Sequence, residues 1–210
     1  MTLANLAGPL GVVTRPNFFT RRNEMQLKPK IVLKEKNSEA NLSTGILEAM
    51  MGWKTNVDLD LHAFAIAKDG TSRHVYFRNL KAPGIKHSGD EGVGGSIDHE
   101  FGNQEKIDVD LSSYSDVVIA ANIYSNAQNF GEVGGVVRVK AGDQEFEVPM
   151  TEKAKGKWCT IAHLNNTGIT PKLRNVNVTT QNQPDINKVI NGTITSDAGS
   201  SGGFFGKIFR

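Results

Sequence analysis

Hydrophobic and polar residues alternate along short stretches of the chain between residues 57 and 164. From Val57 to Phe64, every second residue is apolar, which is the period of a half-buried strand. Turn residues such as Lys68-Asp69-Gly70 and Ala141-Gly142-Asp143 separate stretches of this kind at intervals of about 8–12 residues. The expected strands are 57–67, 74–80, 106–111, 117–125, 134–141, 144–150 and 157–164. No long helical stripe interrupts residues 57–150, so the pattern predicts an all-β antiparallel sandwich or barrel.

The residues before this region are less regular. Residues 1–24 contain Gly8-Pro9 and end on Arg21-Arg22, which predicts an N-terminal arm, either a flexible leader or a docking arm. Residues 25–36 alternate loosely and suit a first strand. Residues 43–53 have a short helical spacing of apolar residues between two glycines, which predicts a loop or a one-turn helix.

After Asn165 the composition becomes polar. Asparagine, threonine and glutamine dominate residues 166–210, and a Ser/Gly run near the end is typical of a linker. Apolar residues return in a short tip formed by Phe204, Phe205, Ile208 and Phe209. We therefore expect a C-terminal extension with a flexible tail, whose apolar tip is either an interaction peptide or a last strand that completes the fold.

Size, charge and cysteine content limit the function classes. A chain of 210 residues suits one domain with extensions, and a net charge of +2 provides no bulk electrostatic attraction to nucleic acid. The single cysteine, Cys159, cannot form an intrachain disulfide and is expected as a buried thiol in a reducing compartment. The chain has neither a secretory signal nor a run of about 18 apolar residues, so we expect a cytoplasmic protein without a transmembrane segment.

Two acidic segments provide the candidate chemistry. Because side chains alternate faces in a strand, Asp58 and Asp60 point the same way, roughly 6.5–7 Å apart. Their mutual repulsion would be relieved by a hard cation with oxygen ligands. The second segment is the glycine-rich stretch 86–95, which contains Asp90-Glu91, and further acids follow it at Asp98, Glu100 and Glu105. Calcium takes about six to eight oxygen ligands, so the supply of oxygens suits it.

Other interpretations of these acids stay open. Asp and Gly are common in turns, so the acidic residues could be solvated turn residues. Asp108 and Asp110 also alternate, but Asp110 precedes a turn that it could cap, and we expect both to be structural. Zinc would need three or four His or Cys ligands at set spacings, and His87 and His99 do not form such a cluster.

Catalytic motifs are absent from the sequence. It contains no phosphate-binding loop, no dinucleotide fingerprint and no nucleophile elbow. The neighbouring His87, Ser88 and Asp90 do not form a triad, because adjacent side chains diverge. A metal-assisted hydrolase would need His87 or His99 as its base, and we expect the protein not to be an enzyme.

Several short motifs in a fixed order resemble the TerD family of tellurium-resistance and general stress proteins, over residues 25–165. They are Gly52-Trp53, DLDLHAFAI (58–66), VYFRNLKAP (75–83), HSGD (87–90), EKIDVDL (105–111), IYSNAQNFGEV (123–133) with a following VRV, and Trp158. The resemblance implies a two-sheet antiparallel β-sandwich that binds Ca²⁺ through acidic loops at one end. It implies no established catalysis, and it implies action in membrane-associated or multi-protein complexes.

The resemblance also assigns metal ligands. Asp58 and Asp60 match the family's D-x-D motif, and Gly89-Asp90 match its G-D-N motif, with Glu91 in place of Asn. Glu105 matches the last acid of a D-D-E motif whose first two acids are Asn103 and Gln104 here. Losing two carboxylates lowers calcium affinity or removes one of two sites, unless acids in the longer loop compensate. The expected ligands are Asp58, Asp60, Asp90, Glu105, Asp98 and Glu100.

We therefore expect a non-enzymatic calcium-binding module of a stress or tellurite-resistance type. Its partners are expected to be other proteins, or copies of itself, bound through residues 1–24 and the C-terminal tip. The alternative is a structural subunit of a large assembly such as a phage particle, with the arm and tail as joints. In that case the protein would be located in the virion.

Overall fold

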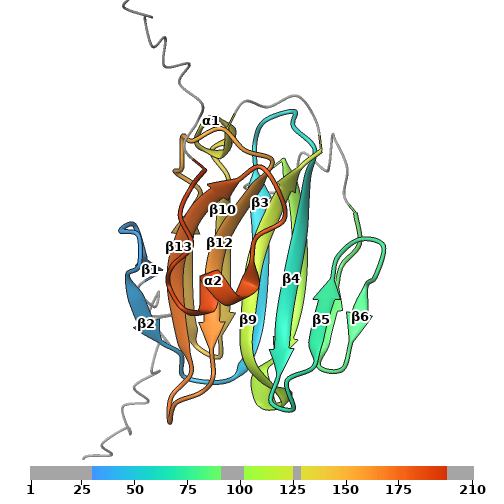
Figure 1. Cartoon of the computed structure of the whole chain (residues 1–210), viewed down its shortest axis with the longest axis vertical. Coiled ribbons are helices and arrows are strands. Elements are labelled where there is room, and N and C mark those ends of the chain that lie inside the picture. The colour runs from blue at the N-terminus through green and yellow to red at the C-terminus, as the bar shows by residue number, and fades with distance from the viewer. Residues whose placement is uncertain (1–29, 91–101, 125–128, 198–210) are drawn as a thin grey trace, which may run out of the picture.

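The alternating segments form two β-sheets that pack face to face as a sandwich (Figure 1). The structure is a computed structural model that describes residues 30–90, 102–124 and 129–197. It confirms the expected all-β sandwich and corrects local assignments at residues 43–53 and 166–180. The expected strand 74–80 is also corrected, because β5 spans Ser72–Val75 and a turn follows it.

The first sheet has seven strands in the order β1-β11-β10-β3-β8-β7-β6. All neighbouring strands are antiparallel except β1, which runs parallel to β11. This sheet is therefore mixed, although the sequence predicted antiparallel pairing throughout. Its strands are β1 (Ile31–Val32), β3 (Ile46–Trp53), β6 (Lys81–Ala82), β7 (Ile85–His87), β8 (Asn103–Asp110), β10 (Val136–Ala141) and β11 (Gln144–Pro149).

The second sheet has six strands in the order β2-β13-β12-β9-β4-β5, and all of its pairs are antiparallel. A hairpin joins β4 to β5 through the expected turn, where Gly70 takes a positive φ of 84° that glycine adopts without strain. The strands are β2 (Glu39–Asn41), β4 (Leu59–Ala67), β5 (Ser72–Val75), β9 (Tyr114–Ile123), β12 (Trp158–Asn165) and β13 (Lys172–Thr180).

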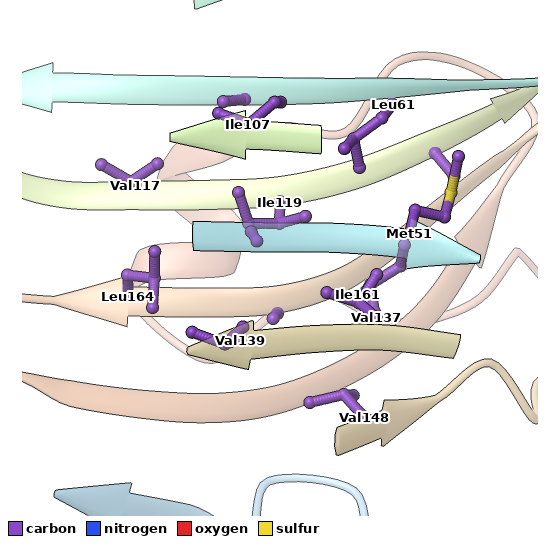
Figure 2. Close-up of a cluster of buried hydrophobic side chains, with 14 of the residues drawn as sticks. Met51, Leu61, Ile107, Val117, Ile119, Val137, Val139, Val148, Ile161 and Leu164 are labelled. Atoms are coloured by element: carbon purple, nitrogen blue, oxygen red, sulfur yellow. The ribbon is translucent and has the colours of Figure 1, made fainter. Parts of the chain in front are cut away.

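The inward side chains of the two sheets form the main hydrophobic core (Figure 2). Leu61, Ile119 and Ile161 from the six-stranded sheet face Met51 and Val137 from the seven-stranded sheet, and all five are fully buried. Residues of one strand reach this core at every second position, as the alternation predicts. Truncating one such side chain to alanine costs about 2–5 kcal/mol of stability.

A smaller hydrophobic cluster lies on the outer face of the six-stranded sheet. Figure 1 shows the short helix α2 (Ile186–Ile190) in front of this sheet, and Val189 packs there against Val118 and Val178. Arg174 of β13 donates from Nη2 to the Val189 carbonyl at 2.6 Å, which holds the helix against the sheet. The other helices among the described residues are the 3-10 turn Leu111–Ser113 and α1 (Phe130–Val133).

Residues 43–53 differ from the expected loop or one-turn helix. Ile46–Trp53 is β3, which pairs with β10 on one side and β8 on the other. Leu47, Ala49 and Met51 point into the core, so the stretch alternates with the period of a strand. The apolar residues on its other face, Ile46 and Met50, produced the apparent helical spacing.

The sandwich also extends beyond the expected boundary at Asn165. Strand β13 lies inside the six-stranded sheet between β2 and β12, although the sequence placed it in the C-terminal extension. Its polar composition misled the prediction because two asparagines are buried and bind backbone groups of other segments. Asn175 donates to the Leu33 carbonyl at 2.9 Å, and Asn177 donates to the Pro149 carbonyl at 2.9 Å.

The arm 1–24 and the apolar tip at Phe204–Phe209 lie outside the described residues. Asp110 caps the 3-10 turn, as expected, by accepting a hydrogen bond from the Ser112 N–H at 2.8 Å. None of the helices among the described residues is long and apolar enough to cross a membrane.

Truncation tests the position of the boundary. We expect a chain that ends at Asn165 not to fold, because it lacks β13 and exposes both the β12 edge and the outer cluster. A matched chain that ends at Asp197 keeps every described element and should melt cooperatively. Far-UV circular dichroism with thermal melting measures both, and a cooperative transition in the shorter chain would contradict the assignment of β13.

Candidate metal centre

Three aspartates from two separate segments converge at one edge of the sandwich. Asp58 precedes β4, Asp60 lies within it, and Asp90 follows β7 of the opposite sheet. One carboxylate oxygen of each can be chosen so that all three lie within 4.8 Å of one another. We call these residues the acidic group. Asp58 and Asp60 both reach Asp90, which is consistent with the same-side orientation that strand alternation predicted.

Burial and the repulsion of neighbouring carboxylates make Asp58 and Asp60 costly to ionise. Burial, followed by the charges of Asp58 and Asp90, raises the pKa of Asp60 to about 6, and Arg78 lowers it slightly. Burial and the charge of Asp90 likewise raise the pKa of Asp58. The folded protein thus holds the Asp60 proton more tightly than the unfolded chain does. The stability that this proton contributes is complete below the unfolded pKa and is lost as the pH rises through about 6. A bound cation would offset that loss.

One histidine connects the two segments that carry the aspartates. His87 is 2% exposed, and its Nδ1 accepts a hydrogen bond from the Gly89 N–H at 2.9 Å. Because Nδ1 is the acceptor, Nε2 carries the proton and donates it to the Leu61 carbonyl at 3.0 Å. Leu61 follows Asp60 and Gly89 precedes Asp90, so the imidazole holds the two ligand-bearing segments together. Burial lowers the pKa of His87, which favours this neutral form.

Glu105 also contacts the backbone of Leu61 and lies outside the acidic group. It is 1% exposed in β8, and its Oε2 accepts a hydrogen bond from the Leu61 N–H at 2.6 Å. Pairing of β4 with β5 ends at Ala63 and Val75, so β5 does not supply partners for Leu61. Glu105 and His87 therefore form the hydrogen bonds that the Leu61 N–H and carbonyl would otherwise lack beyond the end of the β4–β5 pairing. These two hydrogen bonds fix the backbone next to Asp60.

Of the other acids that the sequence singled out, some lie outside the described residues and one lies apart from the acidic group. Asp98 and Glu100 lie outside the described residues. Asp108 is on the outer face of the seven-stranded sheet, 3.7 Å from the Lys106 ammonium. Asn103, which replaces a family carboxylate, is 5% exposed and donates from Nδ2 to the Thr55 carbonyl at 3.2 Å. An ionised aspartate could not donate this hydrogen bond, so the amide here supports the loop that leads to Asp58.

Sequence reasoning did not predict that His87 joins the two segments that carry the aspartates. It also did not predict the contact between two other histidines. His62 and His74 lie on the outer face of the six-stranded sheet, with His62 Nδ1 2.9 Å from His74 Nε2. Strand alternation could have indicated this, because His62 is two residues after Asp60 and shares its face. Cys159 is fully buried as expected, and burial raises the pKa of its thiol to about 12.

Comparison with known protein families matches residues 25–152 to the TerD domain, which is more than half of the chain. The resemblance inferred from the short motifs is thereby confirmed. No curated protein matches the chain.

A pair of substitutions separates the ligands from the residues that position them. We expect Glu105→Gln to change the affinity for Ca²⁺ by no more than about threefold, because the amide oxygen can still accept from Leu61. Asp60→Asn should weaken the affinity by more than about tenfold, because it removes a ligand charge. Competition with a chromophoric chelator measures both affinities. An equal loss in the two variants would show that Glu105 is itself a ligand.

Proposed function

The chain belongs to the TerD family, and on this premise we propose that it is a non-enzymatic calcium-binding module of the stress and tellurite-resistance type, which acts through protein–protein assembly in the cytoplasm. The observation that carries the proposal is the convergence of Asp58, Asp60 and Asp90 within 4.8 Å of one another. Carboxylates from separate segments form such a group only where the fold holds them together against their repulsion. A cation supplies the compensating charge.

The donor set favours calcium over other common metal ions. Three carboxylates provide between three and six oxygens, depending on whether each binds through one oxygen or two, and calcium accepts about six to eight in flexible geometry. Waters or further groups would supply the remaining ligands. Magnesium demands near-ideal octahedral geometry and keeps more of its waters. Zinc prefers imidazole and thiolate, whereas both ring nitrogens of His87 are already hydrogen-bonded to backbone groups.

The same histidine supports a binding role over a catalytic one. A metal-assisted hydrolase would need a base near the cation, and His87 is the described histidine that the sequence offered for it. Its Nδ1 accepts from Gly89 and its Nε2 donates to Leu61, so a proton transfer would break the contact between the two ligand-bearing segments. The non-enzymatic part of the proposal rests on this arrangement.

Calcium should stabilise the protein measurably. At a free Ca²⁺ concentration of about 100 times Kd, a single site adds about 2.7 kcal/mol to the free energy of unfolding. Denaturant unfolding of the full chain in calcium and in chelator measures this difference. The Asp58→Asn, Asp60→Asn double variant should lose it, whereas the control Asp108→Asn, which changes an acid outside the acidic group, should keep it. Identical unfolding in calcium and chelator would refute the calcium site.

The assembly part of the proposal concerns the two ends of the chain. The paired phenylalanines and arginines of residues 1–24 and the apolar residues of the C-terminal tip are sequence features that suit docking. These segments lie outside the described residues, so the proposal that they mediate assembly is supported by the sequence alone.

Removing either end should leave the sandwich folded, because residues 1–24 and 200–210 include none of the described strands. We expect each truncated protein to keep its far-UV circular dichroism spectrum and to form smaller particles than the full chain. Size-exclusion chromatography with light scattering at several concentrations measures the mass. A full-length protein that stays monomeric at high concentration would count against assembly through these ends.

A further inference from the structure

A pocket of about 370 Å³ opens on the outer face of the six-stranded sheet and shares Asp60 with the acidic group. We call it the aromatic pocket. Its volume lies within the range of small-molecule sites. Strands β4, β5, β9 and β12, the turn after β5 and the segment before α2 all contribute to its walls. The lining residues are Asp60, His62, His74, Tyr76, Phe77, Arg78, Asn122, Tyr124, Trp158 and Gln183.

Aromatic rings form much of the wall. The His74 ring stacks on Tyr76 with centroids 4.4 Å apart, and the Trp158 indole lies 4.6 Å from the His62 imidazole at a tilt of 53°. Tyr124 is 67% exposed, so its ring is available to a ligand without displacing other side chains. Rings of this kind present flat surfaces on which the C–H faces of a pyranose ring can pack.

The polar groups of the pocket are chiefly uncharged. Asn122 and Gln183 provide amides, each of which both donates and accepts. His62 Nδ1 and His74 Nε2 are 2.9 Å apart, and a hydrogen bond between them requires one of the two nitrogens to be an unprotonated acceptor, so at least one of these imidazoles is neutral. Apart from the histidines, only Asp60 and Arg78 among the described lining residues carry a full charge.

With a divalent cation bound, the site is nearly neutral. Three carboxylates and one divalent ion leave a single negative charge, and the adjacent Arg78 balances it. The loaded site therefore has little electrostatic preference for an anionic or a cationic ligand. Calcium would still have coordination positions to fill beyond those of the three carboxylates, and neutral oxygens suit them.

A buried nitrogen in the wall lacks a partner. His62 is 4% exposed, and its Nε2 has no hydrogen-bond partner in the described structure. The bond between His62 Nδ1 and His74 Nε2 can run in either direction, so Nε2 is a donor in one tautomer and an acceptor in the other. The nitrogen itself is closed to solvent, so a ligand hydroxyl, which both donates and accepts, would reach it only after neighbouring side chains move.

From these observations we infer that the aromatic pocket binds a neutral saccharide, with a sugar ring against the aromatic wall and hydroxyl oxygens completing the coordination of the cation beside Asp60. The inference rests on the proposed calcium site, because the cation supplies part of the binding. Amides and a shared carboxylate are groups that recognise hydroxyls, and the exposed ring of Tyr124 provides the stacking surface.

Nuclear magnetic resonance of the full-length, ¹⁵N-labelled protein tests this at saturating calcium. The probes are the methyl glycosides of glucose, mannose and galactose, with phenyl phosphate as an anionic aromatic comparison. The chain has two tryptophans, which provide an internal control. We expect a glycoside to shift the indole N–H signal of Trp158. The signal of Trp53, which is fully buried and hydrogen-bonded to the Val57 carbonyl, should stay in place.

Two surface variants provide the matched comparison. Tyr124→Ala should raise the Kd for the glycoside about tenfold by removing an exposed ring, with calcium affinity unchanged. Ile46→Ala removes a similarly exposed apolar side chain on the opposite sheet and should have no effect. Asp60→Asn should weaken glycoside binding together with calcium binding.

The outcomes distinguish this inference from the proposed function. If calcium binds but no glycoside shifts Trp158, or only phenyl phosphate does, the saccharide site is refuted and the calcium module stands. Equal glycoside binding in calcium and in chelator would refute the role of the cation. If calcium itself fails to bind, the proposed function fails and this inference fails with it.

Discussion

The hydrogen bonds of the His87 imidazole connect the two segments on which the candidate site depends. The Leu61 carbonyl accepts from one ring nitrogen, and the Gly89 N–H donates to the other. Glu105 accepts from the Leu61 N–H on the same strand edge. The two interactions with Leu61 are needed because pairing of β4 with β5 ends at Ala63, which would otherwise leave the buried N–H and carbonyl of Leu61 without partners. The requirement for backbone hydrogen bonding and the assembly of the acidic group are thus met by the same side chains.

The arrangement concentrates negative charge around one buried carboxylate, that of Asp60. Asp60 is 4% exposed, and its neighbours Asp58 and Asp90 raise the cost of ionising it further. A protein tolerates such a group when the charge serves a ligand, since the free energy lost in the empty site is recovered on binding. The carboxylates come from segments of both sheets, since Asp60 lies in β4 and Asp90 follows β7. A cation held by both segments would strengthen the link between the two sheets that His87 already makes.

The outer face of the six-stranded sheet carries both a hydrophobic cluster and the aromatic pocket. One part is covered by α2 and the cluster around Val118 and Val189, which closes it to solvent. The part next to Asp60 remains open as the aromatic pocket. The residues after Asn165 therefore contribute more than a linker, because β13 supports α2 and the segment before that helix brings Gln183 to the pocket wall. The TerD sandwich in this chain thus carries a metal site and a pocket that share one carboxylate.

Local pattern in the sequence was sufficient for most of the strands from residue 57 to 165, though not for β6 and β7, and for the hairpin turns and the same-side orientation of Asp58 and Asp60. These features follow from alternation and turn chemistry, which act between near neighbours. Strands β3 and β13 could not be predicted, because the strands on either side of β3 and the loops that bind Asn175 and Asn177 come from elsewhere in the chain. The meeting of Asp90 with Asp60 and the attachment of Glu105 to Leu61 likewise depend on how the two sheets pack. Sequence determined which residues could ligate a cation, whereas the tertiary structure decided which of them meet, because contacts between distant segments are set by packing and not by spacing along the chain.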